Sequence, residues 1–247
     1  AMYYQGQGVK KDYAEAARLY MLAADQGDVA AQNELSRMQK EFADFAEERR
    51  NGRGVNEDYA EAVRLYTLAA DQGNAEAQVH LGDMYFEGQG VKQDYAEAAR
   101  LYRLAADQGD AGAQARLGYM YYKDRGVKKD YAEAARLYRL AADQGNVNAQ
   151  SGLAGLYRNG QGVKKDLKEA VRLYGLAADQ GNAAAQFKLA NMYHMGQGVK
   201  KNVKEAARLY RLAADQGQPR AQFNLGYLYY SGEEVVKDLK EAARLYT

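Results

Sequence analysis

The 247-residue sequence contains no cysteine and no tryptophan, and it has only one proline and two histidines. The absence of cysteine excludes disulfide frameworks, thiolate zinc sites, iron–sulfur clusters and thiol nucleophiles. No run of about 18 apolar residues occurs, so the sequence predicts no membrane span. Lys and Arg number 34 against 33 Asp and Glu. This balance argues against a broadly basic protein that binds nucleic acid.

What the sequence does contain is an internal repeat. The string Ala-Ala-Asp-Gln-Gly begins at Ala23, Ala69, Ala105, Ala141, Ala177 and Ala213, so the first gap is 46 residues and the others are 36. We therefore predict one continuous array of about six and a half 36-residue repeats over residues 1–247. The longer gap indicates an insertion of about ten residues, near 39–50, which we expect to lengthen one helix. The array starts and ends within a repeat, so we expect it to be a piece of a longer chain.

Each repeat contains two predicted helices that are separated by glycines. The first, helix A, is typified by residues 74–87; it starts at Asp or Asn and ends before a Gly-x-Gly loop. The second, helix B, is typified by residues 94–108. Asp94 and Glu97 have the spacing of a capping box at its start. Nothing alternates with a period of two residues, so the predicted class is all-α.

Positions that are identical between repeats are expected to hold the array together. In helix A these include Ala77, Leu81 and Met84, which we predict to face the core. In helix B we expect the leucines at positions 101 and 104 to fill the space between helices. The repeated Glu and Arg three residues apart in helix B are expected to pair on the exposed surface.

The pattern of one repeat is carried by Ala77, Gln78, Leu81, Gly82, Met84, Tyr85, Gly88, Gly90, Val91, Asp94, Tyr95, Ala98, Leu101, Tyr102, Ala105, Ala106 and Gly109. This pattern resembles the Sel-one-like repeat family, which is related to the tetratricopeptide repeats. The resemblance implies a right-handed α-α superhelical solenoid whose A helices line a concave surface. It also implies a bacterial adaptor protein, and a periplasmic or secreted location rests on the resemblance alone.

Positions of helix A that vary between repeats lie opposite the repeated core positions, at about 100° per residue. They hold most of the aromatic side chains that are not part of the repeat. We predict that this face binds a partner through Phe86, Tyr119, Tyr122, Arg158, Phe187, Asn191, His194, Phe223, Tyr227 and Tyr230. Tyr and Phe provide a large contact area and have little rotamer entropy to lose. The alternative is that these side chains fill gaps between neighbouring A helices.

The sequence offers little that could carry out catalysis. His80 and His194 lie at different positions of distant repeats, and neither a His-x-x-x-His nor a Gly-x-Ser-x-Gly motif is present. We therefore predict no catalytic residue, no metal site and no cofactor, and we expect that the protein is not an enzyme.

The predicted function is a protein–protein interaction scaffold that binds a protein or peptide, and no nucleic acid, in the concave groove. Two alternatives remain open. The resemblance includes cysteine-rich bacterial proteins linked to β-lactams, which implies a module that binds or hydrolyses cell-wall fragments or β-lactams. The other alternative is a specific neutraliser of a toxin effector, of the immunity type. Half-repeats at both ends leave open a monomer or a head-to-tail association.

Overall fold

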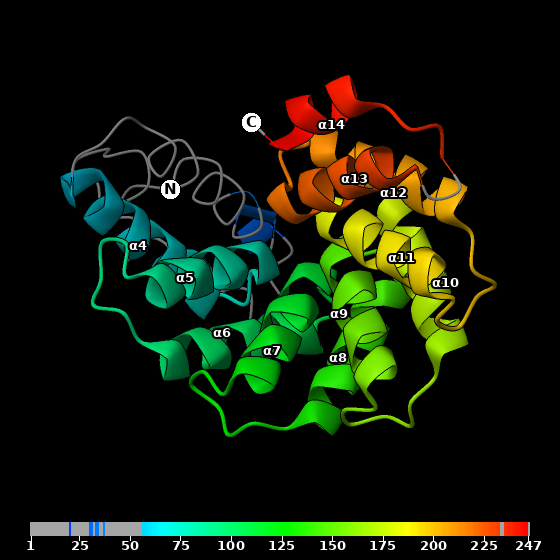
Figure 1. The fold of residues 1–247 in the computed structure, drawn as a ribbon. Coiled ribbons are helices and arrows are strands. Elements are labelled where there is room, and N and C mark those ends of the chain that lie inside the picture. The colour runs from blue at the N-terminus through cyan, green and yellow to red at the C-terminus, as the bar shows by residue number, and fades with distance from the viewer. Residues whose placement is uncertain are drawn as a thin grey trace. The chain divides into compact units, whose positions relative to one another are not determined.

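The computed structural model describes residues 20, 30, 31, 33, 34, 37, 56–232 and 235–246. The predicted insertion at 39–50 lies outside these residues. Within them, eleven complete helices and no strand are present (Figure 1), which confirms the all-α prediction for this part of the chain. In chain order they are α4 (Asn56–Asp71), α5 (Ala75–Glu87), α6 (Tyr95–Asp107), α7 (Ala111–Lys123), α8 (Tyr131–Asp143), α9 (Val147–Asn159), α10 (Leu167–Asp179), α11 (Ala183–Met195), α12 (Val203–Asp215), α13 (Pro219–Ser231) and α14 (Leu239–Tyr246).

The chain divides into two compact units, and each is described by itself. Unit 1 comprises residues 1–113 and 125–127, and unit 2 comprises residues 114–124 and 128–247. In unit 2 the A helices are α7, α9, α11 and α13, and the B helices are α8, α10, α12 and α14. From α8 to α14, consecutive helices pack against each other. The helices therefore alternate between an A layer and a B layer along this unit (Figure 1).

The starts of the B helices confirm one half of the predicted capping box and correct the other. The Asp94 carboxylate accepts hydrogen bonds from the backbone N–H groups of Ala96 and Glu97, at 2.9 and 3.0 Å. Glu97 does not reach back to Asp94; it pairs with Arg100 at 2.6 Å. The backbone N–H of Asp94 instead donates to the carbonyl of Tyr85 at 2.9 Å. The reciprocal bond is absent because that donor ties helix B to the preceding helix A.

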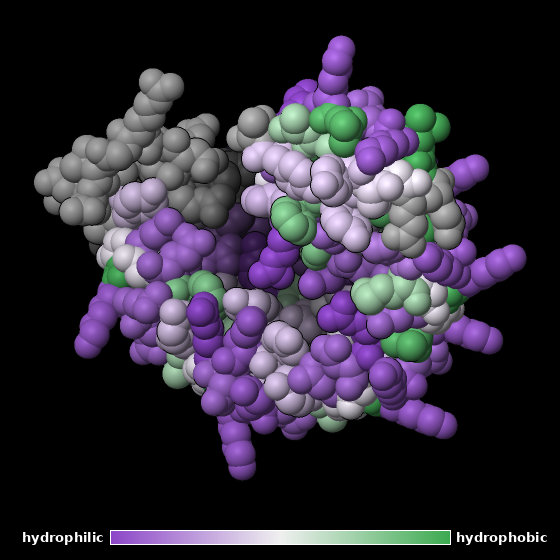
Figure 2. Space-filling view, in the orientation of Figure 1, coloured by the Kyte–Doolittle hydropathy of each residue, from purple (hydrophilic) through white to green (hydrophobic). Residues whose placement is uncertain are grey.

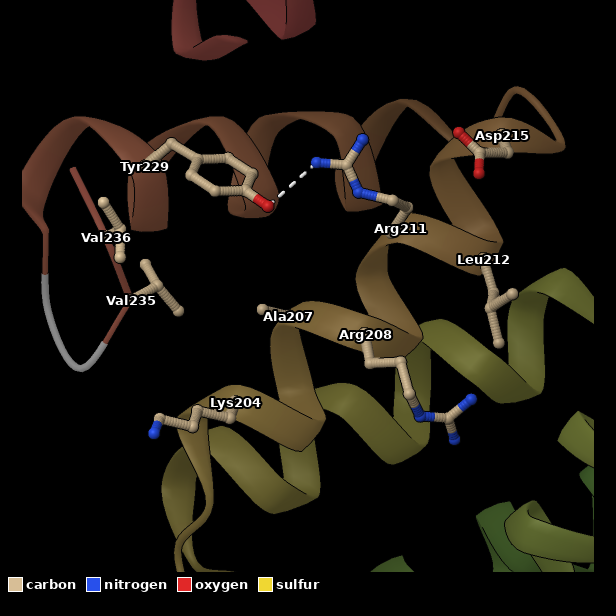
Figure 3. A pocket seen from close by; sticks show the side chains of 9 residues that line it. All are labelled: Lys204, Ala207, Arg208, Arg211, Leu212, Asp215, Tyr229, Val235 and Val236. Atoms are coloured by element: carbon tan, nitrogen blue, oxygen red, sulfur yellow. Dashed lines mark hydrogen bonds between the residues drawn. The ribbon is translucent and has the colours of Figure 1, made fainter. Parts of the chain in front are cut away.

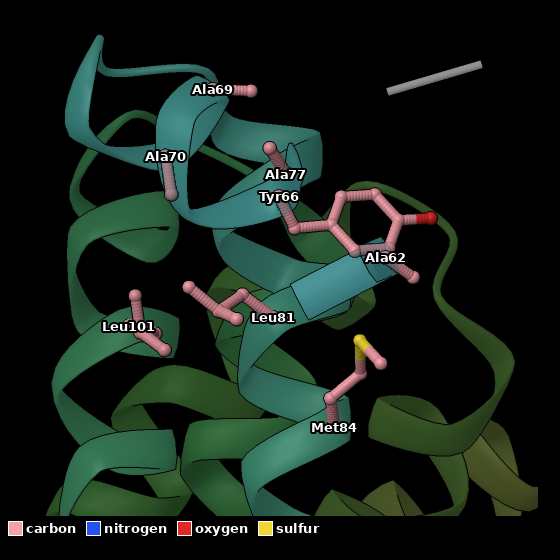
Figure 4. Packing of buried hydrophobic residues seen from close by; sticks show 8 residues of the cluster. All are labelled: Ala62, Tyr66, Ala69, Ala70, Ala77, Leu81, Met84 and Leu101. Atoms are coloured by element: carbon pink, nitrogen blue, oxygen red, sulfur yellow. The ribbon is translucent and has the colours of Figure 1, made fainter. Parts of the chain in front are cut away.

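The core of unit 1 shows how small and large side chains share the interior (Figure 4). Tyr66, Leu81 and Met84 are buried together with alanines of α4 and α5. A Cβ added at Gly82 would lie 2.7 Å from the ring of Tyr102, so glycine at this position lets the tyrosine pack against the α5 backbone. The expectation that helix A buries its repeated alanine, leucine and methionine is confirmed.

The expectation for the second leucine of helix B is wrong. Leu101 is buried, but Leu104 is 40% exposed, and Leu140, Leu176 and Leu212 are similarly exposed. Each of these leucines occupies the same position of its B helix. In unit 2, Leu140, Leu176 and Leu212 therefore recur as exposed apolar side chains at a sequence spacing of one repeat.

A network of glutamines holds the repeats together, and the sequence analysis did not foresee it. The side-chain amide of Gln144 donates to the side chain of Gln114 at 3.0 Å, and the same bond joins Gln180 to Gln150 at 2.9 Å. Gln150 in turn donates to the carbonyl of Ala142 in the preceding B helix at 3.5 Å. Buried polar groups need partners of this kind, which explains why glutamine recurs at both positions.

Buried tyrosines predict a loss of stability at alkaline pH. Burial raises the pKa of Tyr138, and it also raises the pKa values of Tyr174 and Tyr210. In the unfolded chain these phenols ionise at a pKa of about 10. Their contribution to stability is therefore fully present below about pH 10 and is lost as the pH rises toward the folded-state pKa values. Urea denaturation between pH 8 and 11.5 should show the free energy of unfolding falling above about pH 10.

The double variant Tyr138→Phe/Tyr174→Phe provides the control for that experiment. This variant keeps both aromatic rings but removes the hydroxyl groups of two of the three buried tyrosines. Its free energy of unfolding should therefore fall less steeply with pH than that of the parent chain. Lysines titrate in the same range and affect both proteins equally. If the free energy of unfolding fell equally steeply with pH in both proteins, the alkaline loss of stability would not come from these tyrosines.

Candidate functional site

Nine of the ten predicted site residues lie on the A helices of unit 2. We call these nine residues, without the buried Phe187, the A face. The set comprises Tyr119 and Tyr122 on α7, Arg158 on α9, Phe187, Asn191 and His194 on α11, and Phe223, Tyr227 and Tyr230 on α13. The tenth residue, Phe86, belongs to α5 in unit 1.

The accessibility of these side chains differs along the unit. Tyr119, Phe223, Tyr227 and Tyr230 are exposed. The remaining side chains of the A face are half-buried. Phe187 is only 8% exposed. Its prediction as a contact residue is therefore corrected, because a side chain with so little surface cannot contribute to binding.

The difference between Phe187 and Phe223 has a structural cause. They occupy the same position of successive repeats, yet Phe223 is 61% exposed. The ring of Phe187 lies 6.0 Å from that of Tyr210 on α12, and α13 follows. Phe223 lies 5.7 Å from Tyr246 on α14, and no A helix follows within the described residues. The exposure of this position is thus set by the helices that come after it.

Asn191 is held in place by the scaffold. Its side-chain oxygen accepts hydrogen bonds from the hydroxyl of Tyr210 at 2.7 Å and from the amide of Asn224 at 3.3 Å. These bonds link α11 to α12 and α13. In unit 1, the carboxylate of Asp83 accepts the same kind of bond from Tyr102 at 2.6 Å. This position therefore fixes the orientation of the A helices as well as contributing polar surface.

The α7 end of the A face combines aromatic rings with a cation. The ammonium of Lys123 lies 5.9 Å from the ring centre of Tyr119 and 5.2 Å from that of Tyr122. Tyr122 also lies 5.6 Å from Tyr131 on α8. Cation–π contacts of this kind orient the rings while leaving part of their surface accessible.

Phe86 in unit 1 is engaged by its own chain. Its ring packs edge-on against Tyr95 at 5.1 Å. The guanidinium of Arg125 lies 5.6 Å from the centre of Phe86 and 5.4 Å from that of Tyr95. The ring is half-buried as a result.

A separate cleft lies along α12, in the B layer of unit 2 (Figure 3). Its volume is about 750 Å³, and it is lined by Lys204, Ala207, Arg208, Arg211, Leu212, Asp215, Tyr229, Val235 and Val236. Arg211 donates to the Tyr229 hydroxyl at 2.9 Å and to Glu241 at 2.8 Å. Hydrogen bonds from Arg244 and Arg211 lower the pKa of Glu241 to about 2.

These contacts identify the α12 cleft as part of the scaffold. Arg208 pairs with Glu205, so both guanidinium groups that line the cleft are already neutralised. The bond from arginine to tyrosine also occurs two repeats earlier, between Arg139 and Tyr157. Both arginines and the tyrosine of the cleft are thus engaged in contacts within the scaffold.

No group of three or more His, Asp or Glu side chains that could hold a metal ion occurs among the described residues. None of the described helices has the length and apolarity needed to cross a membrane. Hydrophilic side chains cover most of the visible face of unit 2, and apolar ones are scattered among them (Figure 2).

The sequence model of the Sel1 repeat matches this chain at residues 1–28, 43–74, 75–110, 111–146, 147–182, 183–218 and 219–247. The chain belongs to the Sel1 repeat family. This confirms the predicted class, an all-α solenoid of repeated helix pairs. Sel1 repeats form scaffolds that typically mediate protein–protein interactions.

Two solved structures are similar over nearly the whole chain. One is a protective antigen present in uropathogenic Escherichia coli strains, which displays an SLR fold; it is 36% identical, with a TM-score of 0.76. The match covers 99% of this chain but only 50% of the antigen, so this chain spans about half the length of that relative. The other is a Sel1 repeat protein from Oxalobacter formigenes, 29% identical with a TM-score of 0.77, and the match covers 93% of this chain and 94% of that protein.

A third similar structure is an immunity protein from Pseudomonas aeruginosa. It is 23% identical, with a TM-score of 0.51, and the match covers 84% of this chain and 80% of the immunity protein. At this identity the likeness shows the fold alone. No curated protein matched the sequence.

Proposed function

We propose that this Sel1 repeat protein is an interaction scaffold that binds a protein or peptide partner on the A face of unit 2. The observation that carries the proposal is the exposure of Tyr119, Tyr227 and Tyr230 at positions that differ between repeats. The side chains that the repeats share are used for caps, core packing and the glutamine network. The variable side chains are therefore the ones left for recognition.

Physical chemistry supports tyrosine as the contact residue. Its ring contributes a large apolar area with few rotamers to freeze, and its hydroxyl adds a directional hydrogen bond. Exposed aromatic side chains that gather on one surface are otherwise a risk for solubility. Tyr119 supports a binding role most directly, because it is 37% exposed on α7 although three further A helices follow in the same unit.

Affinity capture tests this proposal with matched variants. The double variant Tyr119→Ala/Tyr227→Ala removes two exposed rings from the A face. The control variant Leu140→Ala/Leu176→Ala removes two similarly exposed side chains from the B layer. Loss of two central aromatic contacts should weaken binding at least about tenfold, whereas the control should capture as much partner as the parent chain. Equal capture by both variants would rule out the A face.

A further inference from the structure

The A helices of unit 2 carry charge of one sign. Arg116, Lys123, Arg158, Lys188 and Arg220 are their only charged side chains apart from a histidine, and they contain no Asp or Glu. The four B helices of the same unit contain nine Lys and Arg and seven Asp and Glu. Among the helices of this unit, the acidic side chains are thus confined to the B layer.

Three of these cations lie on successive A helices. Arg158 is on α9, Lys188 on α11 and Arg220 on α13. Partial burial lowers the pKa of Lys188, and the positive charges of Arg158 and Arg220 lower it further. Lys188, on the middle helix, therefore lies within the electrostatic field of a like charge on each neighbouring A helix.

No carboxylate of the described residues offsets this repulsion. On the B helices, Arg136, Arg172, Arg208 and Arg244 each pair with a glutamate three residues earlier. Arg158, Lys188 and Arg220 form no such pair in the part of the chain that the structure describes. Lys188 is half-buried beside these like charges, which costs free energy, and an incoming anion would offset this cost.

We propose that the A face, together with Lys188 on α11 and Arg220 on α13, binds an acidic segment of the partner protein, whose carboxylates pair with Arg158, Lys188 and Arg220. The inference rests on the proposed function and specifies the chemistry of the partner. Arginine can bind a carboxylate through two parallel hydrogen bonds, and lysine adds a point charge. Tyr119 and Tyr227 lie on the same layer and contact the apolar side chains between the acidic ones.

The arrangement of the cations suits a peptide. Each of three successive A helices carries one of them, so an extended segment that crosses these helices can place one carboxylate at each cation. A nucleic acid carries a charge on every nucleotide, and proteins that bind it commonly make about six to ten phosphate contacts. The few cations of this layer fall short of that number.

Fluorescence anisotropy with a labelled synthetic peptide tests the proposal. The peptide has 12 residues with glutamate at every third position and serine or alanine elsewhere, and its counterpart has glutamine in place of glutamate. The parent chain should bind the glutamate peptide and not the glutamine one. The triple variant Arg158→Gln/Lys188→Gln/Arg220→Gln should weaken binding about 10- to 100-fold.

A matched control removes the same charge elsewhere in unit 2. Lys164→Gln/Lys165→Gln/Lys200→Gln changes three exposed loop lysines and should alter the affinity less than about twofold if binding is local. Circular dichroism verifies that both triple variants are folded. Failure of the glutamate peptide to bind, equal losses in the two triple variants, or tighter binding of an oligothymidylate of equal charge would each overturn the proposal.

The captured partner separates this inference from the proposed function. The partner could be lost from the Tyr119→Ala/Tyr227→Ala variant and retained by the Arg158→Gln/Lys188→Gln/Arg220→Gln variant. This result would overturn the proposal that the partner contributes an acidic segment, but it would support binding at the A face. A partner retained by both variants would overturn the two together. Loss from both, with retention by the loop-lysine control, is the expected result.

Discussion

Replacing Gly162 with alanine is expected to lower the free energy of unfolding by about 3–5 kcal/mol, since backbone strain and a steric clash add together. Gly162 has a φ of +67°, in the left-handed region. A Cβ at this position would overlap the carbonyl group of Tyr131 at the start of α8. The glycine loop after α9 therefore packs directly on the backbone of the preceding B helix, and a side chain there would force the two repeats apart.

Gly145→Ala provides the matched control for this prediction. Gly145 also has a positive φ, +86°, but nothing lies within 4 Å of an added Cβ. Its replacement should cost only the left-handed conformation, about 1–2 kcal/mol. Urea denaturation of both variants measures the difference. Equal destabilisation would mean that the Gly162 loop is not a contact between repeats.

The second prediction concerns two leucines of α10. Leu173 is 2% exposed, and Leu176, three residues later, is 41% exposed. Leu173→Ala should lower the free energy of unfolding by about 2–5 kcal/mol because it removes buried surface and leaves a cavity. Leu176→Ala should cost less than about 1 kcal/mol because the side chain is largely hydrated already.

Thermal and urea denaturation of the two variants test this assignment. Each variant loses the same atoms from the same helix, so differences in helix propensity cancel. A loss of stability for Leu176→Ala as large as that for Leu173→Ala would show that the outer leucines are covered, for example by association between chains. That result would also remove their use as neutral controls for binding.

The repeat made most of the fold predictable. The 36-residue period, the Asp or Asn at helix starts and the glycines after helix ends fixed the order and type of the elements, and the observed α5 and α6 agree with the predicted segments 74–87 and 94–108. The role of the second leucine was not predictable. Leu101 and Leu104 are three residues apart, so helical periodicity places both on one broad face, and only the packing of neighbouring helices separates buried from exposed.

The candidate site was predictable in part for a similar reason. Comparison between repeats identified the variable positions of helix A, but it could not tell Phe187 from Phe223, because the covering helices decide their exposure. The cations Lys188 and Arg220 were missed although the signal was present. The net charge of the whole chain is only +1. The absence of Asp and Glu from the A helices of unit 2 is seen only when the charges of the A and B helices are counted separately.

The account depends most on the claim that the partner contacts the variable side chains of the A layer. The dissociation constant of the purified partner for Tyr119→Ala/Tyr227→Ala, relative to that for Leu140→Ala/Leu176→Ala, tests this claim most directly. The account predicts a ratio of at least about ten. A ratio of one, or weaker binding by the variant of the B layer, would contradict it.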